Sequence, residues 1–501
     1  MKNKNAFPIL LLASIFIISG CSNTQVSSSS YNEGDSSSYS SSSSDSSTSS
    51  SDIPGGGEGE ETAKEIEVEM DASLRAEGSS TDPYNLTFTY DDKLFVESAK
   101  TYDKDLSMLS FASSVATATK ERGTKFFSDI NFENVTAHGY DAEPTKDSMG
   151  YFFAHKSIRD FELVAVGFRG FNYGLEWANN FTIGKTGNHE GFAARGQEAY
   201  QELQSYINTY AKNKTLKLWI NGYSRAGAMS HVLTSLILKG DKVNVTQDNM
   251  FVYTFEAPAS LSEENALEYE NVHNIINDVD LITYIPPESY GLKRCGVEYD
   301  IYDANASTLV KEFDETIEFP EFVTISGITD EPMESDSDVL DFVLNSVFNK
   351  DEGADQDVYA NTREQYVDNY QAGLSSCIGY IFGLKESTRT ELLTALKDMG
   401  FGAIAIIGDD TGASLMDFMK TYLDKDNVSY DEEQLLADCA IFIKGVTNLF
   451  MQVLLMFLLD DYSPDITRLI DMHYPETTYV LLNNAHNKVV RQKNEKRYFS
   501  Y

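Results

Sequence analysis

The chain has 501 residues, 42% of them hydrophobic, and its 39 basic against 78 acidic side chains give a formal net charge of −39. So acidic a chain argues against nucleic acid as a partner and against electrostatic attachment to an anionic membrane. Four cysteines are too few for a disulfide scaffold, and the length fits two to four domains or one domain with a large insertion.

The first twenty residues have the composition of a secretory signal. Lys2 and Lys4 precede an apolar run, Phe7 to Ile18, which is too short to span a bilayer. The run ends in Ile-Ser-Gly before Cys21, which resembles a bacterial lipobox and implies cleavage and lipidation at Cys21. We therefore expect a lipoprotein signal peptide over residues 1–20 and an extracytoplasmic protein anchored to the cell membrane by its lipid. An ordinary secretory signal is the alternative.

Residues 21–80 are dominated by serine, glycine and acidic side chains. Almost nothing apolar is available there to offset the conformational entropy of the chain, so we expect a disordered tether. A specific recognition tail is the alternative.

From about residue 81 the composition becomes globular, and strand-length apolar runs alternate with helical patterns. The predicted strands are Phe161–Phe168, Leu216–Ile220, Met250–Phe255 and Val272–Ile276, and the predicted helices between them are Phe192–Tyr210 and Ala228–Leu238. This alternation predicts an α/β fold with a mainly parallel sheet. We expect the core to cover residues 81–299 and to resume over residues 466–501.

Residues 300–465 predict a mostly helical insertion. The helical patterns are Val339–Val347, Leu384–Met399, Ser414–Leu423 and Asp431–Leu459, and acidic loops join them. The last pattern contains an apolar stretch, 437–459, that raises the possibility of a membrane span. Its charged and amide side chains favour a buried or substrate-facing helix instead.

Three cysteines remain after lipidation, Cys295, Cys377 and Cys439, and an odd number cannot all pair with one another. The chain has no CxxC motif and no Cys/His cluster in its sequence, so we expect neither a zinc site nor a cofactor.

The sharpest local feature is Gly222-Tyr223-Ser224-Arg225-Ala226, where a predicted strand turns abruptly into a predicted helix. A serine at such a turn is held clear of the sheet at the N-terminus of the helix. Gly222 permits the sharp backbone, and the small Ala226 lets the helix approach the strand. The motif would arise by chance about 0.2–0.5 times in a chain this long, so its weight comes from the strand-turn-helix context.

A nucleophilic serine needs a base, an orienting acid and oxyanion donors. In this type of fold they follow in the order serine, aspartate, histidine. Asp278 and Asp280 both lie at the end of a predicted strand, and the pattern alone does not separate them. His473 and His486 follow them. The other histidines precede the serine or lie within predicted elements, where a structural role is expected; they are His138, His155, His189, His231 and His273.

Several blocks of the chain resemble, in order, those of the class 3 (fungal-type) lipases. These blocks are Ala165–Gly170 with Trp177 and Asn180, Asn188–Phe192, Gly222–Arg225, Tyr253–Pro258 and Asp280–Pro287. The resemblance covers about residues 85–300 and resumes near residues 470–485. It implies an α/β-hydrolase fold that cleaves acylglycerols or related esters, with the helical insertion as a cap over Ser224.

The resemblance also implies roles for single residues. Ser224 would be the nucleophile, Asp280 would orient the base, and His473 would be the base, with His486 as the alternative. The oxyanion donors would be the backbone N–H groups of Phe171 and Arg225.

Three features depart from the family pattern. Phe171 stands where a hydroxyl residue is usual, Ala226 replaces a glycine, and the interval from Asp280 to His473 is unusually long. The sequence thus predicts a serine ester hydrolase with an ester or lipid substrate, and it does not separate this activity from that of a peptidase or thioesterase with the same triad. A non-catalytic binding or scaffold lipoprotein on a hydrolase fold is the alternative.

Overall fold

The computed structural model describes residues 63–75, 79–140, 144–171, 174–212, 215–319, 335–348, 362–399, 409, 411–444, 468–469, 471–486 and 491–492. The predicted signal peptide, Cys21 and most of the predicted tether lie outside these residues.

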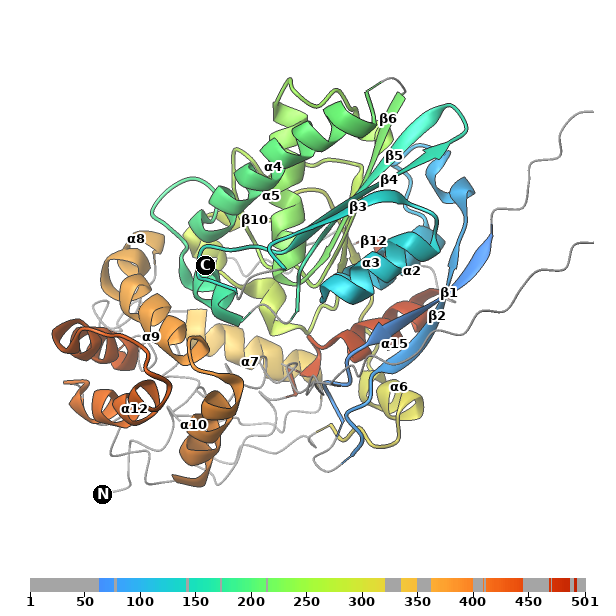
Figure 1. Ribbon diagram of the computed structural model, residues 1–501. Coiled ribbons are helices and arrows are strands. Elements are labelled where there is room, and N and C mark those ends of the chain that lie inside the picture. Colours follow the sequence, from blue (N-terminus) through green and yellow to red (C-terminus); the bar gives the residue numbers. More distant parts are fainter. Residues whose placement is uncertain are drawn as a thin grey trace, which may run out of the picture.

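An eight-stranded sheet forms the centre of the molecule (Figure 1). Its spatial order is β12-β11-β9-β7-β6-β5-β4-β3. The pairs from β5 to β11 are parallel, and the outer pairs are antiparallel. The prediction of an α/β fold with a mainly parallel sheet is confirmed. The strands are β3 (Glu133–His138), β4 (Tyr151–Ile158), β5 (Phe161–Phe168), β6 (Thr215–Tyr223), β7 (Met250–Phe255), β9 (Val272–Ile276), β11 (Val297–Asp300) and β12 (Arg491–Gln492).

Helices cover both faces of this sheet (Figure 1). One face is covered by α4 (Glu190–Tyr210) and α5 (Arg225–Lys239), and the other by α2 (Lys104–Ala116), α3 (Lys120–Asp129) and α15 (Pro475–His486). Because both faces are covered, every residue of β5, β7 and β9 is buried. This is why these strands are mainly apolar rather than alternating, with Glu162 in β5 and His273 and Asn274 in β9 as buried polar exceptions.

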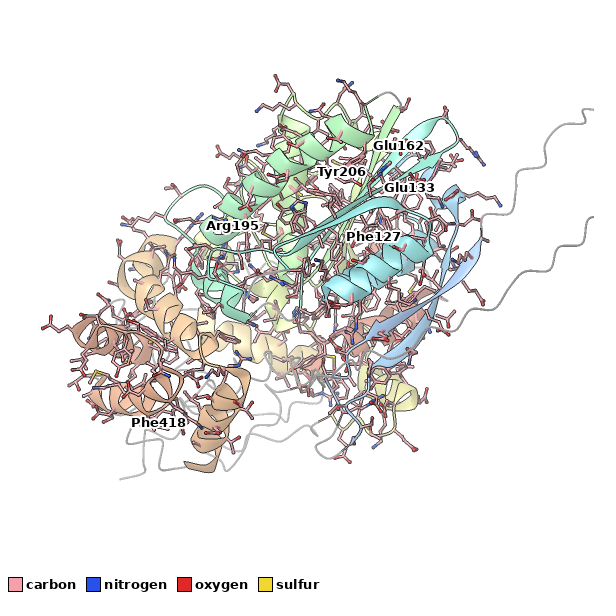
Figure 2. The ribbon with its side chains drawn as sticks, viewed as in Figure 1. Phe127, Glu133, Glu162, Arg195, Tyr206 and Phe418 are labelled. Carbon is pink, nitrogen blue, oxygen red and sulfur yellow. The ribbon has the colours of Figure 1, made fainter. Side chains whose placement is uncertain are left out.

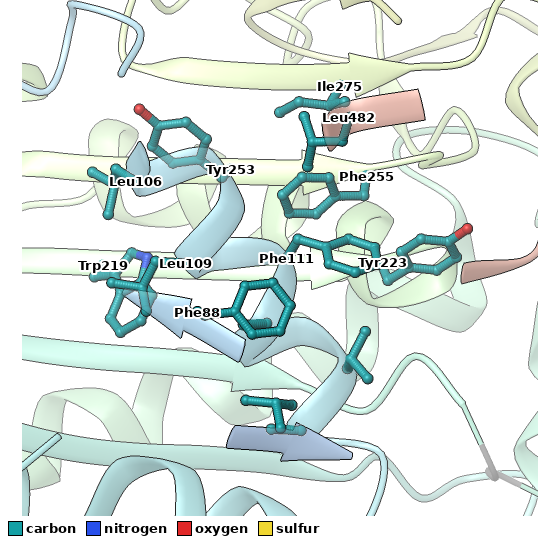
Figure 3. Close-up of a cluster of buried hydrophobic side chains, with 14 of the residues drawn as sticks. Phe88, Leu106, Leu109, Phe111, Trp219, Tyr223, Tyr253, Phe255, Ile275 and Leu482 are labelled. Carbon is teal, nitrogen blue, oxygen red and sulfur yellow. The ribbon is translucent and has the colours of Figure 1, made fainter. Parts of the chain in front are cut away.

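The core beneath α2 is aromatic. The Phe111 ring centroid lies 5.5 Å from that of Phe255 and 6.1 Å from that of Tyr223. Figure 3 shows these rings together with Leu482 of α15, so the C-terminal helix packs directly on the strand ends.

The end of the predicted tether is ordered. β1 (Lys64–Met70) pairs antiparallel with β2 (Tyr84–Tyr90), and its residues Ile66, Val68 and Met70 are buried in the core cluster. The prediction of disorder is therefore wrong for residues 64–70. The strict alternation of apolar and charged residues there is a strand signal, which the acidic composition of the whole segment concealed.

The predicted cap divides into two parts. α6 (Ala306–Phe313) and α7 (Asp336–Phe348) pack on the core, where Ala306, Val339 and Leu340 join the same apolar cluster as α15. The predicted boundary at residue 300 is therefore wrong for these two helices. A separate apolar cluster unites the remaining described helices, here called the cap helices: α8 (Arg363–Tyr366), the π-helical segment η8 (Val367–Gln371), α9 (Ala372–Phe382), α10 (Glu386–Met399), α12 (Ala413–Asp426) and helical residues 432–444.

The cap helices lie to one side of the sheet core: in Figure 2 the labelled Phe418 of α12 is at the lower left, away from the labelled Phe127 of α3. The shorter elements are η2 (Asp92–Phe95), η3 (Gly174–Phe181), η4 (Gln247–Asn249), β8 (Leu261–Ser262), η5 (Leu281–Tyr284), η6 (Glu288–Tyr290) and β10 (Leu292–Lys293). Cys295, Cys377 and Cys439 are buried free thiols. Within the described ranges, no helix combines the length and the apolar character needed to cross a bilayer, and residues 445–459 of the apolar stretch fall outside those ranges.

Candidate active site

Ser224 lies alone between the end of β6 and the start of α5. Its φ of 54° and ψ of −126° are values that non-glycine residues rarely adopt. Its N–H donates to the carbonyl of Phe255 at 2.8 Å, which ties the turn to the neighbouring strand β7. The serine therefore stands at the carboxyl end of the parallel strands and at a helix N-terminus, where developing negative charge is stabilised.

Two glycines permit the close approach of α5 to the sheet. A Cβ at Gly222 would lie 2.4 Å from the carbonyl carbon of Ala226, and a Cβ at Gly227 would lie 2.7 Å from the Cβ of Ala257. Ala226 itself is fully buried. The structure thus accommodates a methyl group at position 226 and demands glycine at the next residue, so the departure from the family motif is compatible with the turn.

His473 lies in the turn before α15 and faces the serine. Its Nε2 is 2.9 Å from Ser224 Oγ, and its Nδ1 is 2.6 Å from Asp280 Oδ2. The carboxylate of Asp280 is fully buried, and its other oxygen accepts the N–H of Ile282 at 2.8 Å. Ser224 and His473 are 249 residues apart in the chain, yet the structure brings them and Asp280 into one hydrogen-bonded line.

Asp278, the alternative acid, has a different hydrogen-bond partner. Asp278 Oδ1 accepts the hydroxyl of Tyr284 at 3.0 Å. The side chain of His486, the alternative base, is outside the described part of the chain.

Three further histidines lie inside the fold, where burial lowers their pKa. The pKa of His189 falls to about 3, and those of His231 and His273 fall to about 4. His231 Nε2 lies 2.6 Å from Asn274 Oδ1, and His273 Nε2 lies 2.9 Å from the carbonyl of Ala99. These rings are neutral at neutral pH and hold neighbouring segments together.

The loop after β5 runs along the other side of the serine turn. A Cβ at Gly170 would lie 2.5 Å from the carbonyl oxygen of Tyr223, so the loop can approach only because this residue is glycine. Phe171 follows, with its ring centroid 4.8 Å from that of Tyr223. The two predicted oxyanion donors, Phe171 and Arg225, therefore lie on segments that flank Ser224.

A buried ion cluster holds that loop to α5. The carboxylate of Glu176, which is fully buried, accepts Arg225 Nη1 at 2.6 Å, Ser148 Oγ at 2.8 Å and Arg169 Nη2. Sequence reasoning did not find this cluster. An available signal was the pair of arginines, Arg169 two residues before Phe171 and Arg225 directly after the serine, with an acidic residue at the start of η3.

No group of three or more His, Cys, Asp or Glu side chains in the described ranges is placed to hold a metal ion. The chemistry open to this arrangement is nucleophilic attack by a hydroxyl whose proton passes to an imidazole.

Residues 165–290 match the family model of the class 3 lipases. This region contains the serine turn and Asp280, whereas His473 lies beyond its end. A lipase from Rhizomucor miehei is 24% identical over 162 residues, which cover 29% of this chain and 44% of that lipase. The chain therefore spans less than half the length of the curated relative that it matches.

Solved lipase structures are similar over part of the chain. A triacylglycerol lipase described as having a serine protease triad is 18% identical, with a TM-score of 0.31, and the match covers 40% of this chain and 79% of that chain. Lipase II from Rhizopus niveus is 14% identical, with a TM-score of 0.29, and the match covers 40% of this chain and 81% of that one.

Proposed function

We propose that this protein is a serine-dependent carboxylic ester hydrolase of the triacylglycerol lipase type, which acts on acylglycerols or related esters. The observation that carries the proposal is the continuous hydrogen-bonded line from Ser224 through His473 to Asp280 at the carboxyl end of a parallel sheet. The family match over residues 165–290 supports the ester as substrate.

In the proposed reaction, Ser224 Oγ attacks the ester carbonyl carbon while His473 Nε2 accepts the hydroxyl proton. Asp280 holds the imidazole in the tautomer with the proton on Nδ1 and stabilises the imidazolium that forms. His473 then gives the proton to the departing alcohol, which leaves an acyl-enzyme. Water attacks the acyl carbon, His473 takes the water proton and returns it to Ser224, and the carboxylic acid is released.

The negative charge on the carbonyl oxygen would be stabilised by the backbone N–H groups of Phe171 and Arg225. Phe171 adds no hydroxyl, so these two amides and the N-terminus of α5 carry this role. Each such donor is worth about 10²–10³ in rate. The cluster of Glu176 with its two arginines helps to keep both donor segments in place.

We further propose that the enzyme works outside the cytoplasm, anchored to the membrane by a lipid on Cys21. The support is the charged start, short apolar run and small residues before that cysteine. Mass spectrometry of the protein from a membrane fraction tests this: a diacylglycerol-modified N-terminal peptide beginning at Cys21 is expected, and an unmodified Cys21 or an intact leader contradicts it.

The activity is tested with Ser224→Ala and with Ser230→Ala as the matched control on the same helix. We expect p-nitrophenyl ester turnover and fluorophosphonate labelling to be lost in Ser224→Ala and kept in Ser230→Ala, with unchanged thermal melts. Parallel assays with thioester and peptide anilide substrates separate the related activities. A wild-type protein that is neither labelled nor active, under conditions in which a control hydrolase reacts, favours the non-catalytic binding protein.

A further inference from the structure

We propose that Glu256 is a positioning residue for the triad: as a neutral carboxylic acid it anchors, through Thr478 and Tyr223, the turn that carries His473. This inference rests on the proposed ester hydrolase function and adds a fourth group behind the base.

Glu256 occupies a strained and completely buried position directly after β7. Its φ is 49°, in the left-handed region that favours glycine, and the side chain is fully buried. Strain of this kind persists where the surrounding structure requires the side chain, which makes Glu256 a candidate functional group.

The carboxyl group of Glu256 links three parts of the active site. Its Oε2 accepts the backbone N–H of Asn277, at the end of β9, at 2.9 Å. Its Oε1 lies 3.2 Å from the hydroxyl of Thr478 on α15. Asn277 in turn donates its side-chain amide to the carbonyl of Met472 at 3.1 Å and accepts the N–H of Asp280 at 2.9 Å.

Counting protons along the hydroxyl chain indicates that Glu256 is neutral. Tyr223 has one hydroxyl proton, and it donates this proton to the carbonyl of His473 at 2.6 Å. The contact of 2.8 Å between the hydroxyls of Tyr223 and Thr478 then requires Thr478 to be the donor. With that proton committed, an ionised Glu256 would leave the contact of 3.2 Å between Thr478 Oγ1 and Glu256 Oε1 without a proton. A protonated Glu256 supplies one, either to this contact or to the carboxylate of Asp280, with which it also shares a side-chain hydrogen bond.

The electrostatic surroundings agree with a neutral carboxyl. Burial and the nearby charge of Asp280 raise the pKa of Glu256 well above its usual range. Burial and the nearby acidic groups of Glu256, Asp280 and Glu476 raise the pKa of the neighbouring Tyr223 well above its usual value, and the Tyr223 hydroxyl donates to the carbonyl of His473.

The consequence is a chain of hydrogen-bonded groups, Glu256, Thr478, Tyr223 and the backbone carbonyl of His473, that holds the base from behind. The base reaches Ser224 only after a separation of 249 residues, so tethering its turn to the strand ends removes freedom that would otherwise misplace the ring.

The test compares Glu256→Gln, which keeps a donor and an acceptor without charge, with Glu256→Gly, which relieves the backbone strain and removes the carboxyl group. Asn131→Gly, at an exposed residue with φ of 60°, controls for glycine at a positive φ. We expect the Gln variant to keep kcat within about threefold and the Gly variant to lose about 10–100-fold in kcat with KM nearly unchanged. Asn131→Gly should match the wild type.

The pH profile separates a neutral from a charged Glu256. A neutral carboxyl predicts that Glu256→Gln leaves the acid limb of kcat/KM where it is and extends the alkaline limb, because glutamine has no proton to lose. A charged carboxylate predicts that its removal moves the acid limb to lower pH, and that result overturns the proposal. Full activity in Glu256→Gly also overturns the proposal.

Thr478→Val and Thr478→Ser provide a second route if the glycine variant does not fold. Thr478→Val should reduce kcat, and Thr478→Ser should restore it. Equal rates in the two variants contradict a role for the hydroxyl at position 478. Fluorophosphonate labelling of the wild type comes first. An unlabelled, inactive wild type overturns the proposed function and this inference with it, whereas a labelled wild type with indifferent Glu256 and Thr478 variants overturns the inference alone.

Discussion

The carboxyl edge of the sheet and the cap helices are built by different rules. At the sheet edge, the backbone itself is unusual: Ser224 and Glu256 both have positive φ, and glycines at 170, 222 and 227 permit contacts closer than any side chain allows. The cap helices bury one apolar face against one another and need only a general pattern to do so. The sheet edge therefore leaves a narrow choice of residues at these positions, whereas the cap helices depend on apolar packing.

The two regions meet at η3 and the loop that follows it. Arg363 of α8 donates to the carbonyls of Ile183 and Gly187, each at 2.7 Å, and also to those of Gly184, Thr186 and Asn188. Gly184 N–H donates to Gln371 in return, at 2.9 Å. Trp177 of η3 stacks on Phe382 of α9 with centroids 6.0 Å apart. The cap is thus held against the same segment whose Glu176 supports the serine turn.

The largest expected effect is a loss of catalysis when a triad residue at the sheet edge is replaced, while the cap helices stay folded. His473→Ala and Asp280→Asn should each lower kcat for ester hydrolysis by about 10³–10⁴-fold, because the base is lost or held in the wrong tautomer. The cap should remain folded, as judged by an unchanged melt. Asp278→Asn is the matched control, with kcat within about threefold of wild type. A comparable loss in Asp278→Asn would contradict the assignment of the acid.

Arg363→Met tests the junction from the side of the cap. It removes the hydrogen bonds from Arg363 to five carbonyls, of which those of Ile183 and Gly184 belong to buried residues, and should weaken the docking of α8 and α9 by about 2–4 kcal/mol. Hydrogen exchange at residues 183–188 and 362–382 should rise, while Ser224 still reacts with a fluorophosphonate. Lys385→Met, at an exposed cap residue, should change neither measurement. Unchanged exchange in Arg363→Met would show that the cap is held by apolar packing alone.

A third pair of variants tests the packing beneath the serine. Gly227→Ala should lower the free energy of unfolding by about 1–3 kcal/mol, because the added methyl group overlaps Ala257. Ala226→Gly, which restores the family motif, should cost only about 0.5–1 kcal/mol through helix propensity. Denaturant unfolding measures both. A larger cost for Ala226→Gly than for Gly227→Ala would contradict the packing described for this turn.

A further prediction concerns a pH dependence of stability that belongs to the core. Burial raises the pKa of Asp471 to about 8 and that of Glu476 to about 7. Between about pH 5 and 8 the folded state holds protons that the unfolded state has released, so stability should fall as the pH rises, by at most about 1.4 kcal/mol per pH unit for each proton.

Thermal melts across this range measure the slope. Glu476→Gln should flatten it, since glutamine keeps the acceptor for the amides of Ser73 and Leu74 without a charge. Glu391→Gln, at an exposed residue of the cap, should leave it as it is. A slope that Glu476→Gln does not alter would mean that other groups carry the linkage.

Local sequence predicted those parts of the fold that local burial dictates. The four predicted strands correspond to β5, β6, β7 and β9, because a strand buried on both faces is mainly apolar. The helices α4 and α5 were found from their periodicity. β1 was missed, since its alternation spans only seven residues within an acidic segment. The core packing of α6 and α7 was missed because an amphipathic helix does not encode which surface it will cover.

The sequence by itself indicated that a serine would stand at a sharp turn between strand and helix, because an apolar strand run ends at Gly222 and a helical pattern begins just after Ser224. The residue pattern did not separate Asp278 from Asp280, which share a strand end; the resemblance to the class 3 lipases favoured Asp280, and neither offered a role for Glu256. Only the tertiary structure brought Asp280 against His473 and showed which hydroxyls lie behind that histidine. The reason is physical: these hydrogen bonds join groups up to 255 residues apart, and their partners exist only once the strand ends and α15 have packed together.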